Sequence, residues 1–363
     1  MENIYERRKT RSFKVGGVGI GSPYKISIQS MTNTDTHDTE ATYSQVLSLA
    51  SVGCDIVRIA LPDIESVKTI AYIKERNEKI PLVADIHYDY KIALEALAAG
   101  IDKIRINPGN IGDKERVRAV TRACQAKNIP IRIGVNSGSL EKEILAKHGG
   151  ATPEALVESA LSHAKILEEL GFSDIAISVK ASSVDKMILA NRLLGERTDY
   201  PLHLGVTEAG GSRAALIKSS VGIGALLSEG IGDTIRVSLT DKPEEEVAVA
   251  KEILSSLRLT DKGGMDIVSC PTCGRTKINL IELASEFERR ARAEGLFDMN
   301  IKVSLMGCAV NGPGEARDAD IGIAGGVGEG LLFKKGQIIR KIKEDKLIDE
   351  LIREIKIMRE SED

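Results

Sequence analysis

Three of the five cysteines in this chain lie in two short motifs whose residue types suit metal ligation. Cys270-Pro271-Thr272-Cys273-Gly274 follows one short apolar run, and Cys308-Ala309-Val310-Asn311-Gly312-Pro313-Gly314-Glu315 follows another. Thiolates are soft ligands that suit iron–sulfur clusters or zinc. A cluster usually takes four cysteines, so with three at hand Glu315 is the candidate fourth ligand. A carboxylate is a hard, labile ligand that can give way to a substrate oxygen.

Structural zinc is the alternative, because Cys-x-x-Cys occurs in both kinds of site and zinc accepts a carboxylate. Closed zinc sites favour cysteine and histidine, however, and no histidine follows His203 in the sequence. The pattern therefore favours a cluster. The other two cysteines, Cys54 and Cys124, lie in apolar contexts and are expected to be small buried hydrophobic residues.

The composition is that of an ordinary globular protein with 363 residues, 28% of them charged and 42% hydrophobic. A net charge of −3 provides no global field for nucleic acid or an anionic membrane. No apolar run approaches the roughly 20 residues that span a bilayer. The charged N-terminus lacks an export signal. An odd, clustered set of cysteines suits a reducing compartment, so we expect a cytoplasmic protein.

Strand-like and helix-like segments alternate from residue 25 to residue 257, which predicts a (β/α)8 TIM barrel within the α/β class. A doubly wound open sheet is the alternative, since both folds share the alternation. The expected strands are 25–31, 55–60, 82–87, 103–107, 131–136, 175–180, 202–207 and 234–239. The expected helices are 41–52, 64–76, 90–99, 114–127, 153–170, 183–194, 211–227 and 244–257. A small hairpin is expected before the barrel, over residues 11–20.

The polar, glycine-bearing stretch 261–264 is the expected boundary between two domains. The first, residues 1–260, would be the barrel, and the second, residues 261–363, a small α+β domain that carries the thiols. In the second we expect strands at 265–269, 301–306 and 320–324, helices at 278–292 and 347–358, and a hairpin near 331–339.

Several predicted strands carry an arginine between two aliphatic residues. Because side chains alternate across a strand, aliphatic residues that face the helices would direct each arginine into the barrel. The inward cations are expected to be Arg58, Arg105, Arg132, Lys180 and Arg236. The same alternation directs polar side chains inward at Asp85, His87, Asn107, Asn136, Ser178, His203, Thr207 and Ser238.

Five inward cations exceed the inward acids, and burying unpaired charge is costly unless an anion binds. Arginine binds phosphate oxygens through two parallel hydrogen bonds, so the pattern favours a small phosphorylated ligand at the C-terminal mouth of the barrel. Structural pairing with Asp85 and neighbouring acids is the alternative. Glu208, in the loop after the seventh strand, is a candidate acid or base, or else a balancing charge for Lys180 or Arg236.

Five segments together resemble the IspG/GcpE family of 4-hydroxy-3-methylbut-2-enyl diphosphate synthases, in its short two-domain bacterial form. They are Ser27–Thr34, Arg105–Asn110, Gly205–Gly210, Cys270–Arg275 and Met306–Glu315. The resemblance implies an iron–sulfur oxidoreductase of the non-mevalonate (MEP) isoprenoid pathway. It would open the ring of 2-C-methyl-D-erythritol 2,4-cyclodiphosphate reductively, with loss of water.

The resemblance also implies roles for individual residues. Cys270, Cys273, Cys308 and Glu315 would ligate one [4Fe-4S] cluster, and Glu208 would be the catalytic acid of the barrel. Diphosphate contacts are implied at Arg58, Arg105, Arg132 and Lys180, with weaker correspondences at His87, Asn107, Asn136, Arg236 and Ser238. Ferredoxin or flavodoxin would supply electrons. A head-to-tail homodimer would place the cluster domain of one subunit over the barrel of the other.

Two other functions fit parts of the pattern. A metal-independent phosphate-handling barrel of the pterin-synthase or aldolase kind, with a zinc-bound tail, would be colourless. A redox sensor or cluster carrier would not need an arginine-lined barrel.

Overall fold

The structure is a computed structural model that describes residues 5–76, 79–260, 264–297, 299–308 and 318–361. The described chain divides into two compact units, Met1–Leu259 and Thr260–Asp363. Each unit has its own hydrophobic core. Each is therefore treated by itself.

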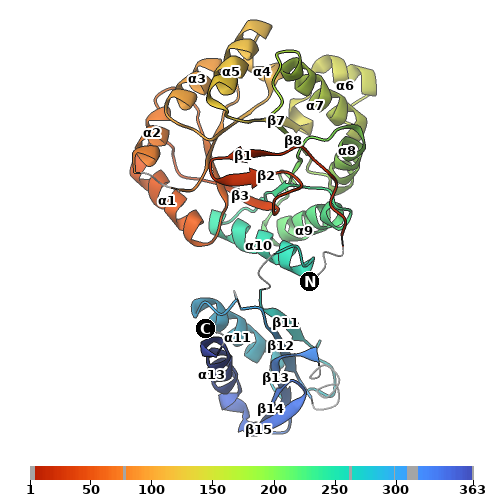
Figure 1. Cartoon of the computed structure of the whole chain (residues 1–363). Coiled ribbons are helices and arrows are strands. Elements are labelled where there is room, and N and C mark those ends of the chain that lie inside the picture. The colour runs from red at the N-terminus through yellow and green to blue at the C-terminus, as the bar shows by residue number, and fades with distance from the viewer. Residues whose placement is uncertain (1–4, 77–78, 261–263, 298, 309–317, 362–363) are drawn as a thin grey trace. The chain divides into compact units, whose positions relative to one another are not determined.

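The first unit is an eight-stranded parallel barrel surrounded by helices (Figure 1). The strands are β3 (Ser27–Met31), β4 (Ile56–Ala60), β5 (Leu82–Asp85), β6 (Lys103–Ile106), β7 (Ile131–Asn136), β8 (Ile175–Lys180), β9 (His203–Leu204) and β10 (Thr234–Ile235). The outer helices are α1 (Thr39–Ser51), α2 (Val67–Glu75), α3 (Tyr90–Ala98), α5 (Lys114–Lys127), α7 (Pro153–Glu168), α8 (Val184–Arg197), α9 (Ser212–Ser228) and α10 (Pro243–Ser256).

The barrel closes between β8 and β9, where Ile177 and Leu202 form a parallel bridge. The Ile177 amide donates to the Pro201 carbonyl at 3.0 Å. The predicted barrel is confirmed, and the open-sheet alternative is wrong because the two end strands of the series meet. Strands β9 and β10 are two residues each, shorter than the sequence predicted.

Two short helices were not predicted, and both lie in loops at the C-terminal ends of strands. Helix α4 (Pro108–Ile111) follows β6. The 3-10 turn η1 (Ser137–Ser139) and helix α6 (Lys142–His148) follow β7. Four of the outer helices, α1, α3, α5 and α7, begin at a side chain that accepts a hydrogen bond from an amide of the first turn. Asp113, for example, accepts from the Arg116 amide at 3.0 Å at the start of α5.

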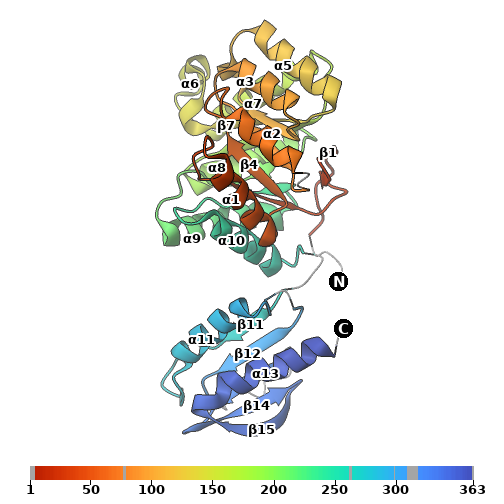
Figure 2. The ribbon, with the colours of Figure 1, turned by 90° about the vertical axis from the view of Figure 1, so that its left-hand side faces the viewer.

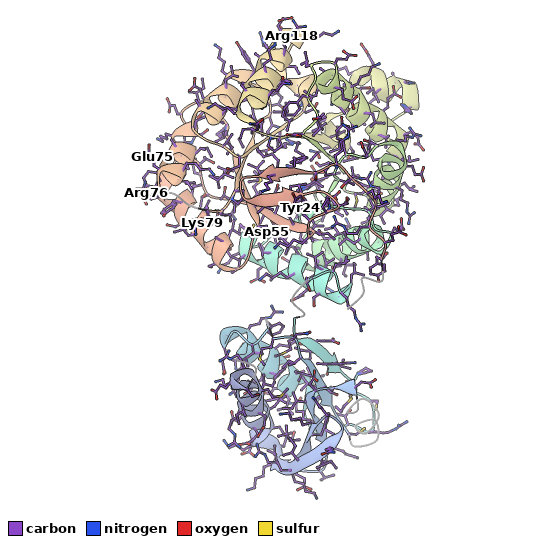
Figure 3. All side chains as sticks on the ribbon, in the orientation of Figure 1. Tyr24, Asp55, Glu75, Arg76, Lys79 and Arg118 are labelled. Atoms are coloured by element: carbon purple, nitrogen blue, oxygen red, sulfur yellow. The ribbon has the colours of Figure 1, made fainter. Side chains whose placement is uncertain are left out.

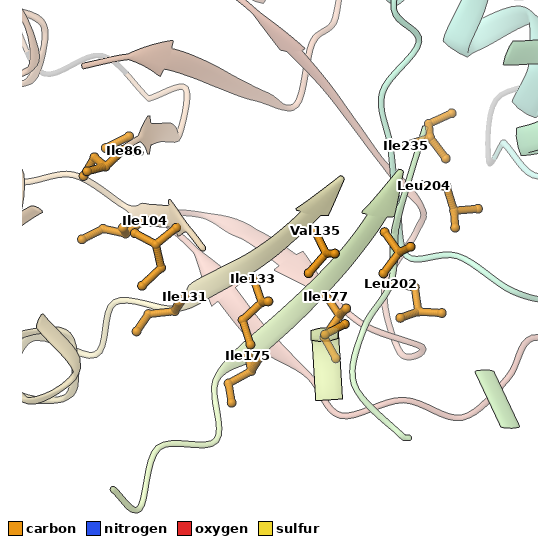
Figure 4. Close-up of a cluster of buried hydrophobic side chains, with 14 of the residues drawn as sticks. Ile86, Ile104, Ile131, Ile133, Val135, Ile175, Ile177, Leu202, Leu204 and Ile235 are labelled. Carbon is orange, nitrogen blue, oxygen red and sulfur yellow. The ribbon is translucent and has the colours of Figure 1, made fainter. Parts of the chain in front are cut away.

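The aliphatic residues of the strands face outward, toward the helices, as the alternation predicted. Figure 4 shows this layer, which includes Ile104, Ile133, Ile177 and Leu204. Charged residues lie on the outer surface of the helices, as Glu75 and Arg76 illustrate in Figure 3. The barrel interior is therefore left to the polar and cationic residues at the alternate positions.

The N-terminal hairpin of β1 (Phe13–Val15) and β2 (Val18–Ile20) lies across the middle of the ring of strands (Figure 1). Its side chains Phe13, Val15 and Ile20 pack against inward residues of three strands, namely Ile56, Val83 and Ala176. These three residues lie at the N-terminal ends of their strands, so the hairpin fills that end of the barrel with apolar side chains.

The second unit is a five-stranded mixed sheet in the order β11-β12-β13-β14-β15. The strands are β11 (Asp266–Ser269), β12 (Lys302–Met306), β13 (Ile321–Gly325), β14 (Glu329–Lys334) and β15 (Gln337–Lys343). The first three are parallel and the last two antiparallel. Helices α11 (Leu280–Ala293) and α13 (Leu347–Glu360) cover one face of the sheet (Figure 2). A 3-10 turn, η2 (Glu344–Lys346), precedes α13.

Candidate functional site

Five cations line the interior of the barrel at the positions that alternation predicted. Arg105, Arg132 and Lys180 are buried, and Arg58 and Arg236 are partly buried. Two glycines, Gly134 on β7 and Gly205 directly after β9, leave room for long cationic side chains of the strand beside each. A Cβ added to Gly134 would lie 2.7 Å from Nη2 of Arg105, and one added to Gly205 would lie 2.8 Å from Nζ of Lys180. The barrel wall is thus shaped around these cations.

Three of the five cations have an acidic partner. Oδ1 of Asp85 lies 3.2 Å from Nη1 of Arg105, and Oδ2 lies 3.8 Å from Nε of Arg58. Burial alone would raise the pKa of Asp85, but attraction to Arg58, the hydrogen bond from His87 and attraction to Arg105 hold it well below its usual value. The structural pairing that the sequence left open therefore exists for Arg58 and Arg105.

Arg236 has a partner that the sequence did not predict. Its Nη2 lies 3.2 Å from Oε1 of Glu246, a buried residue of α10. Glu246 also accepts from the Ser30 hydroxyl at 2.8 Å and from the Leu239 amide at 3.3 Å. Glu246 therefore joins the end of β3 to the segment after β10, and it holds Arg236 in place.

Arg132 and Lys180 form no ion pair within the described part of the chain, and neither does a third buried cation, Lys103. Burial and then repulsion from Arg236 and Arg132 lower the pKa of Lys180 well below its usual value. Burial and repulsion from Arg132 act in the same direction on the pKa of Lys103. The cations that remain after structural pairing thus have no ion-pair partner among the described residues, although Asp85 attracts Arg132 from a greater distance.

Lys103 was missed by the sequence argument, which started from arginines flanked by aliphatic residues. It is 1% exposed and lies two positions before Arg105 on β6, so the same alternation directs it inward. His203 on β9 is also buried, and neither of its ring nitrogens has a hydrogen-bond partner. Burial and the nearby Arg132 lower the pKa of His203 well below its usual value. Nε and Nη1 of Arg132 are buried without a partner as well.

The other predicted contact residues lie at the C-terminal ends of the strands. Asn136 ends β7, and Asn107 follows β6 and is buried. His87 follows β5 and is half exposed, with Nε2 3.5 Å from Oδ2 of Asp85. Ser238 lies after β10 and is half-buried. All four therefore belong to the same end of the barrel as the cations.

A cavity of about 530 Å³ opens at this end, on the side of β3, β4 and β5. Asp85 and His87 line it, together with Asp35 and Tyr88. The cavity therefore reaches the ion pairs of Arg58 and Arg105 through their shared carboxylate.

Glu208 is exposed in the loop between β9 and α9, and its backbone has φ of 51°. This left-handed conformation costs a non-glycine residue about 1 kcal/mol or more and is enriched at functional sites. The position is consistent with the predicted acid or base at the barrel mouth, and none of the described contacts assigns Glu208 to Lys180 or Arg236.

The thiol-bearing loops of the second unit are joined by hydrogen bonds. Strands β11 and β12 are parallel neighbours, and the Cys270 amide donates to the Leu305 carbonyl at 3.2 Å. The Gly307 amide donates to Sγ of Cys270 at 3.2 Å. The Lys277 amide donates to the Gly307 carbonyl at 2.9 Å. The backbone at Cys270 and the backbone at Gly307, far apart in sequence, thus lie together at one end of the sheet.

The side chains themselves are less organised than the backbone. All five cysteines are free, with Cys273 exposed and Cys270 and Cys308 half-buried. Within the described residues, no group of three or more His, Cys, Asp or Glu side chains is arranged to hold a metal ion. Glu315, the predicted fourth ligand, lies outside the described residues. The donor set is nevertheless suited to iron and sulfide, since thiols on joined loops receive a backbone amide at one sulfur.

Among the helices that the structure describes, none has the length and apolar character needed to cross a membrane.

Two family models together cover nearly the whole chain. The model described as the GcpE TIM-barrel domain matches residues 10–251, and that described as the GcpE protein C-terminal domain matches residues 266–357. The chain is 59% identical over 358 residues to a protein of Ruminiclostridium cellulolyticum, which covers 99% of this chain and 100% of that protein. It is 58% identical over 347 residues to one of Clostridium perfringens, with 96% and 98% covered. Both relatives are named 4-hydroxy-3-methylbut-2-en-1-yl diphosphate synthase (flavodoxin).

Among solved structures, dihydropteroate synthase from Stenotrophomonas maltophilia is similar with a TM-score of 0.50 and 15% identity. The similarity covers 69% of this chain and 97% of that one. The likeness shows the barrel fold alone.

Proposed function

This chain belongs to the GcpE family, and from that membership we infer that it is a 4-hydroxy-3-methylbut-2-en-1-yl diphosphate synthase. It is an oxidoreductase of the non-mevalonate isoprenoid pathway. Its reaction converts 2-C-methyl-D-erythritol 2,4-cyclodiphosphate to 4-hydroxy-3-methylbut-2-enyl diphosphate and water. Two electrons and one proton are consumed, one C–O bond to the diphosphate breaks, and one hydroxyl oxygen leaves as water. The observation that carries this conclusion is 59% identity over 99% of the chain.

The barrel is the proposed binding site for the diphosphate. Arg132 and Lys180 have no acidic partner among the described residues, and Arg105 already lies beside them with its guanidinium held by Asp85. A diphosphate would supply the missing negative charge and accept the parallel hydrogen bonds that arginine donates. Arg58, Arg236, His87, Asn107, Asn136 and Ser238 are the remaining proposed contacts. Binding energy from the diphosphate would then hold the reacting carbon in a fixed orientation.

The second unit is the proposed site of a [4Fe-4S] cluster, with Cys270, Cys273, Cys308 and Glu315 as its ligands. When bound, the cluster would supply electrons one at a time and one iron able to accept a substrate oxygen. Glu315 is the ligand we expect to give way, because a carboxylate is harder than a thiolate. The Gly307 amide beside Cys270 would stabilise negative charge on that sulfur.

Glu208 is the proposed acid of the barrel. Its carboxyl group would hold or protonate the hydroxyl oxygen that leaves as water. The loop that carries it lies at the same end of the barrel as the cations, so one bound substrate would be within reach of both.

Three further proposals complete the function. Flavodoxin is the proposed electron donor, supported by the names of the relatives. A homodimer, in which one subunit completes the site of the other, is proposed from the resemblance to the family. A cytoplasmic location is proposed from the five free cysteines.

Purification without oxygen tests the proposed function most directly. We expect a brown protein that contains iron and sulfide, and that converts the cyclodiphosphate when reduced flavodoxin is supplied. Protein that is colourless, contains zinc and binds the cyclodiphosphate without converting it would support the phosphate-handling barrel instead. A brown protein that does not bind the cyclodiphosphate would support a cluster carrier.

A further inference from the structure

Thr276 lies between the two thiol-bearing loops and contacts both of them. Its Oγ1 accepts a hydrogen bond from the Cys273 amide at 3.1 Å, and its own amide donates to the Cys273 carbonyl at 3.0 Å. These two bonds close the turn from Cys273 to Thr276. The orientation of the exposed Cys273 therefore depends on the hydroxyl of Thr276.

The same side chain fills the space beside Gly307. A Cβ added to Gly307 would lie 2.8 Å from Cγ2 of Thr276 and 3.1 Å from its Oγ1. The amide of Gly307 is the group that donates to Sγ of Cys270. One residue thus contacts the backbone of Cys273 on one side and the residue that binds the Cys270 sulfur on the other.

We propose that Thr276 is a positioning residue of the iron–sulfur site, and this proposal rests on the proposed function above. Its hydroxyl fixes the Cys273 loop, and its methyl group holds Gly307 in the position from which the amide reaches Cys270. Cys270 and Cys273 then lie on a loop whose backbone is already joined to Gly307 before a cluster binds. Amide hydrogen bonds to cysteine sulfur are one determinant of cluster potential, so a change in the position of Gly307 should alter the potential of the cluster.

Two substitutions separate the two contacts. Thr276→Val keeps the branched shape beside Gly307 but removes the acceptor for the Cys273 amide. Thr276→Ser keeps the acceptor but removes the methyl group. Thr272→Val is the matched control, because Thr272 is an exposed threonine in the same Cys-x-x-Cys loop. A general effect of losing a threonine hydroxyl near the thiols would appear in the control too.

The experiment uses the full-length protein with its cluster, purified without oxygen. A ferrous chelator is added, and the loss of the visible absorbance is followed, while the midpoint potential is measured in a separate titration. We expect Thr276→Val to lose its cluster about three to ten times faster than the parent protein, which corresponds to one neutral hydrogen bond. Thr276→Ser should lose its cluster at nearly the parent rate but show a shifted midpoint potential. Thr272→Val should match the parent in both measurements.

Gly307→Ala provides a second, independent variant. Its new Cβ would meet Thr276, so we expect faster cluster loss and a shifted potential, and we expect Thr276→Ser in the same chain to reduce both effects. Parent-like rates and potentials in Thr276→Val and Gly307→Ala would overturn the role of Thr276 while leaving a brown, active enzyme and therefore the proposed function intact. A parent protein without iron would instead overturn the proposed function, and this inference with it.

Discussion

Gly134 offers a test of the anion site that leaves every charged side chain in place. Gly134 lies on β7, directly beside the guanidinium of Arg105 on β6. A Cβ at this position would lie 2.7 Å from Nη2 and 2.9 Å from Cζ, closer than real Cβ atoms approach such groups. Gly134→Ala should therefore displace the guanidinium from its place beside Asp85, where Nη1 and Oδ1 are now 3.2 Å apart.

The size of the effect follows from the contact that is lost. A hydrogen bond to a charged group contributes about 1.5–3 kcal/mol. Loss of the Arg105 contact to a bound diphosphate should therefore weaken binding by about 10- to 150-fold. Overpacking should also lower the free energy of unfolding by about 1–3 kcal/mol.

Binding is measured by calorimetric titration of the oxygen-free holoenzyme with the cyclodiphosphate, with no reductant present, so that no turnover occurs. Gly138→Ala is the matched control, because a Cβ at Gly138, in the turn after the same strand, meets nothing within 4 Å. In an Arg105→Ala background, Gly134→Ala should cause little further loss of affinity, since its effect acts through Arg105. Unchanged affinity in Gly134→Ala, or full additivity with Arg105→Ala, would refute the reasoning.

Three further predictions follow from the same site. Asp85→Asn should lower the free energy of unfolding by about 3–5 kcal/mol, because it leaves the buried Arg105 and the partly buried Arg58 without their carboxylate. The pKa of Asp85 is depressed in the folded protein, so the parent should lose this stability as the pH falls below about 4 while the variant does not, and urea titrations at several pH values measure the difference. Binding of the cyclodiphosphate should be accompanied by proton uptake, since burial lowers the pKa values of Lys180, Lys103 and His203 and a bound anion would raise these pKa values. Calorimetry in buffers of different ionisation enthalpy measures the proton uptake, and a binding heat independent of the buffer would contradict it. Glu208→Gly should raise the free energy of unfolding by about 1 kcal/mol, because glycine adopts the left-handed backbone conformation without strain, and it should abolish turnover. Glu208→Gln should abolish turnover without the gain in stability. An active glycine variant would exclude Glu208 as the acid.

The inward side chains of the barrel were predictable because side chains alternate between the two faces of a strand with a period of two residues. Placing the aliphatic residues of β6 and β7 against the helices fixes the inward direction of Arg105 and Arg132 without any knowledge of their neighbours. The same period directs Lys103 inward, two positions before Arg105, although the prediction did not include it. Strand ends were less predictable, since β9 stops after Leu204 although apolar residues continue to Val206.

Contacts between elements were beyond the sequence argument. Glu246 lies on helix α10, where a helical period describes only its own face, and nothing local indicates that it reaches Arg236. The contact of the Cys270–Thr276 loop with Gly307 likewise depends on the parallel pairing of β11 with β12. The motifs indicated which residues would ligate a metal, but not how their loops are held together.

The apolar hairpin at the base of the barrel has a kinetic consequence. Phe13, Val15 and Ile20 pack among the first residues of the strands, so the described residues leave the opposite end of the barrel for a charged molecule to approach the buried cations. Substrate and product must then use one passage in turn. The product, 4-hydroxy-3-methylbut-2-enyl diphosphate, should accordingly be a competitive inhibitor with respect to the cyclodiphosphate substrate, and turnover should slow as the product accumulates.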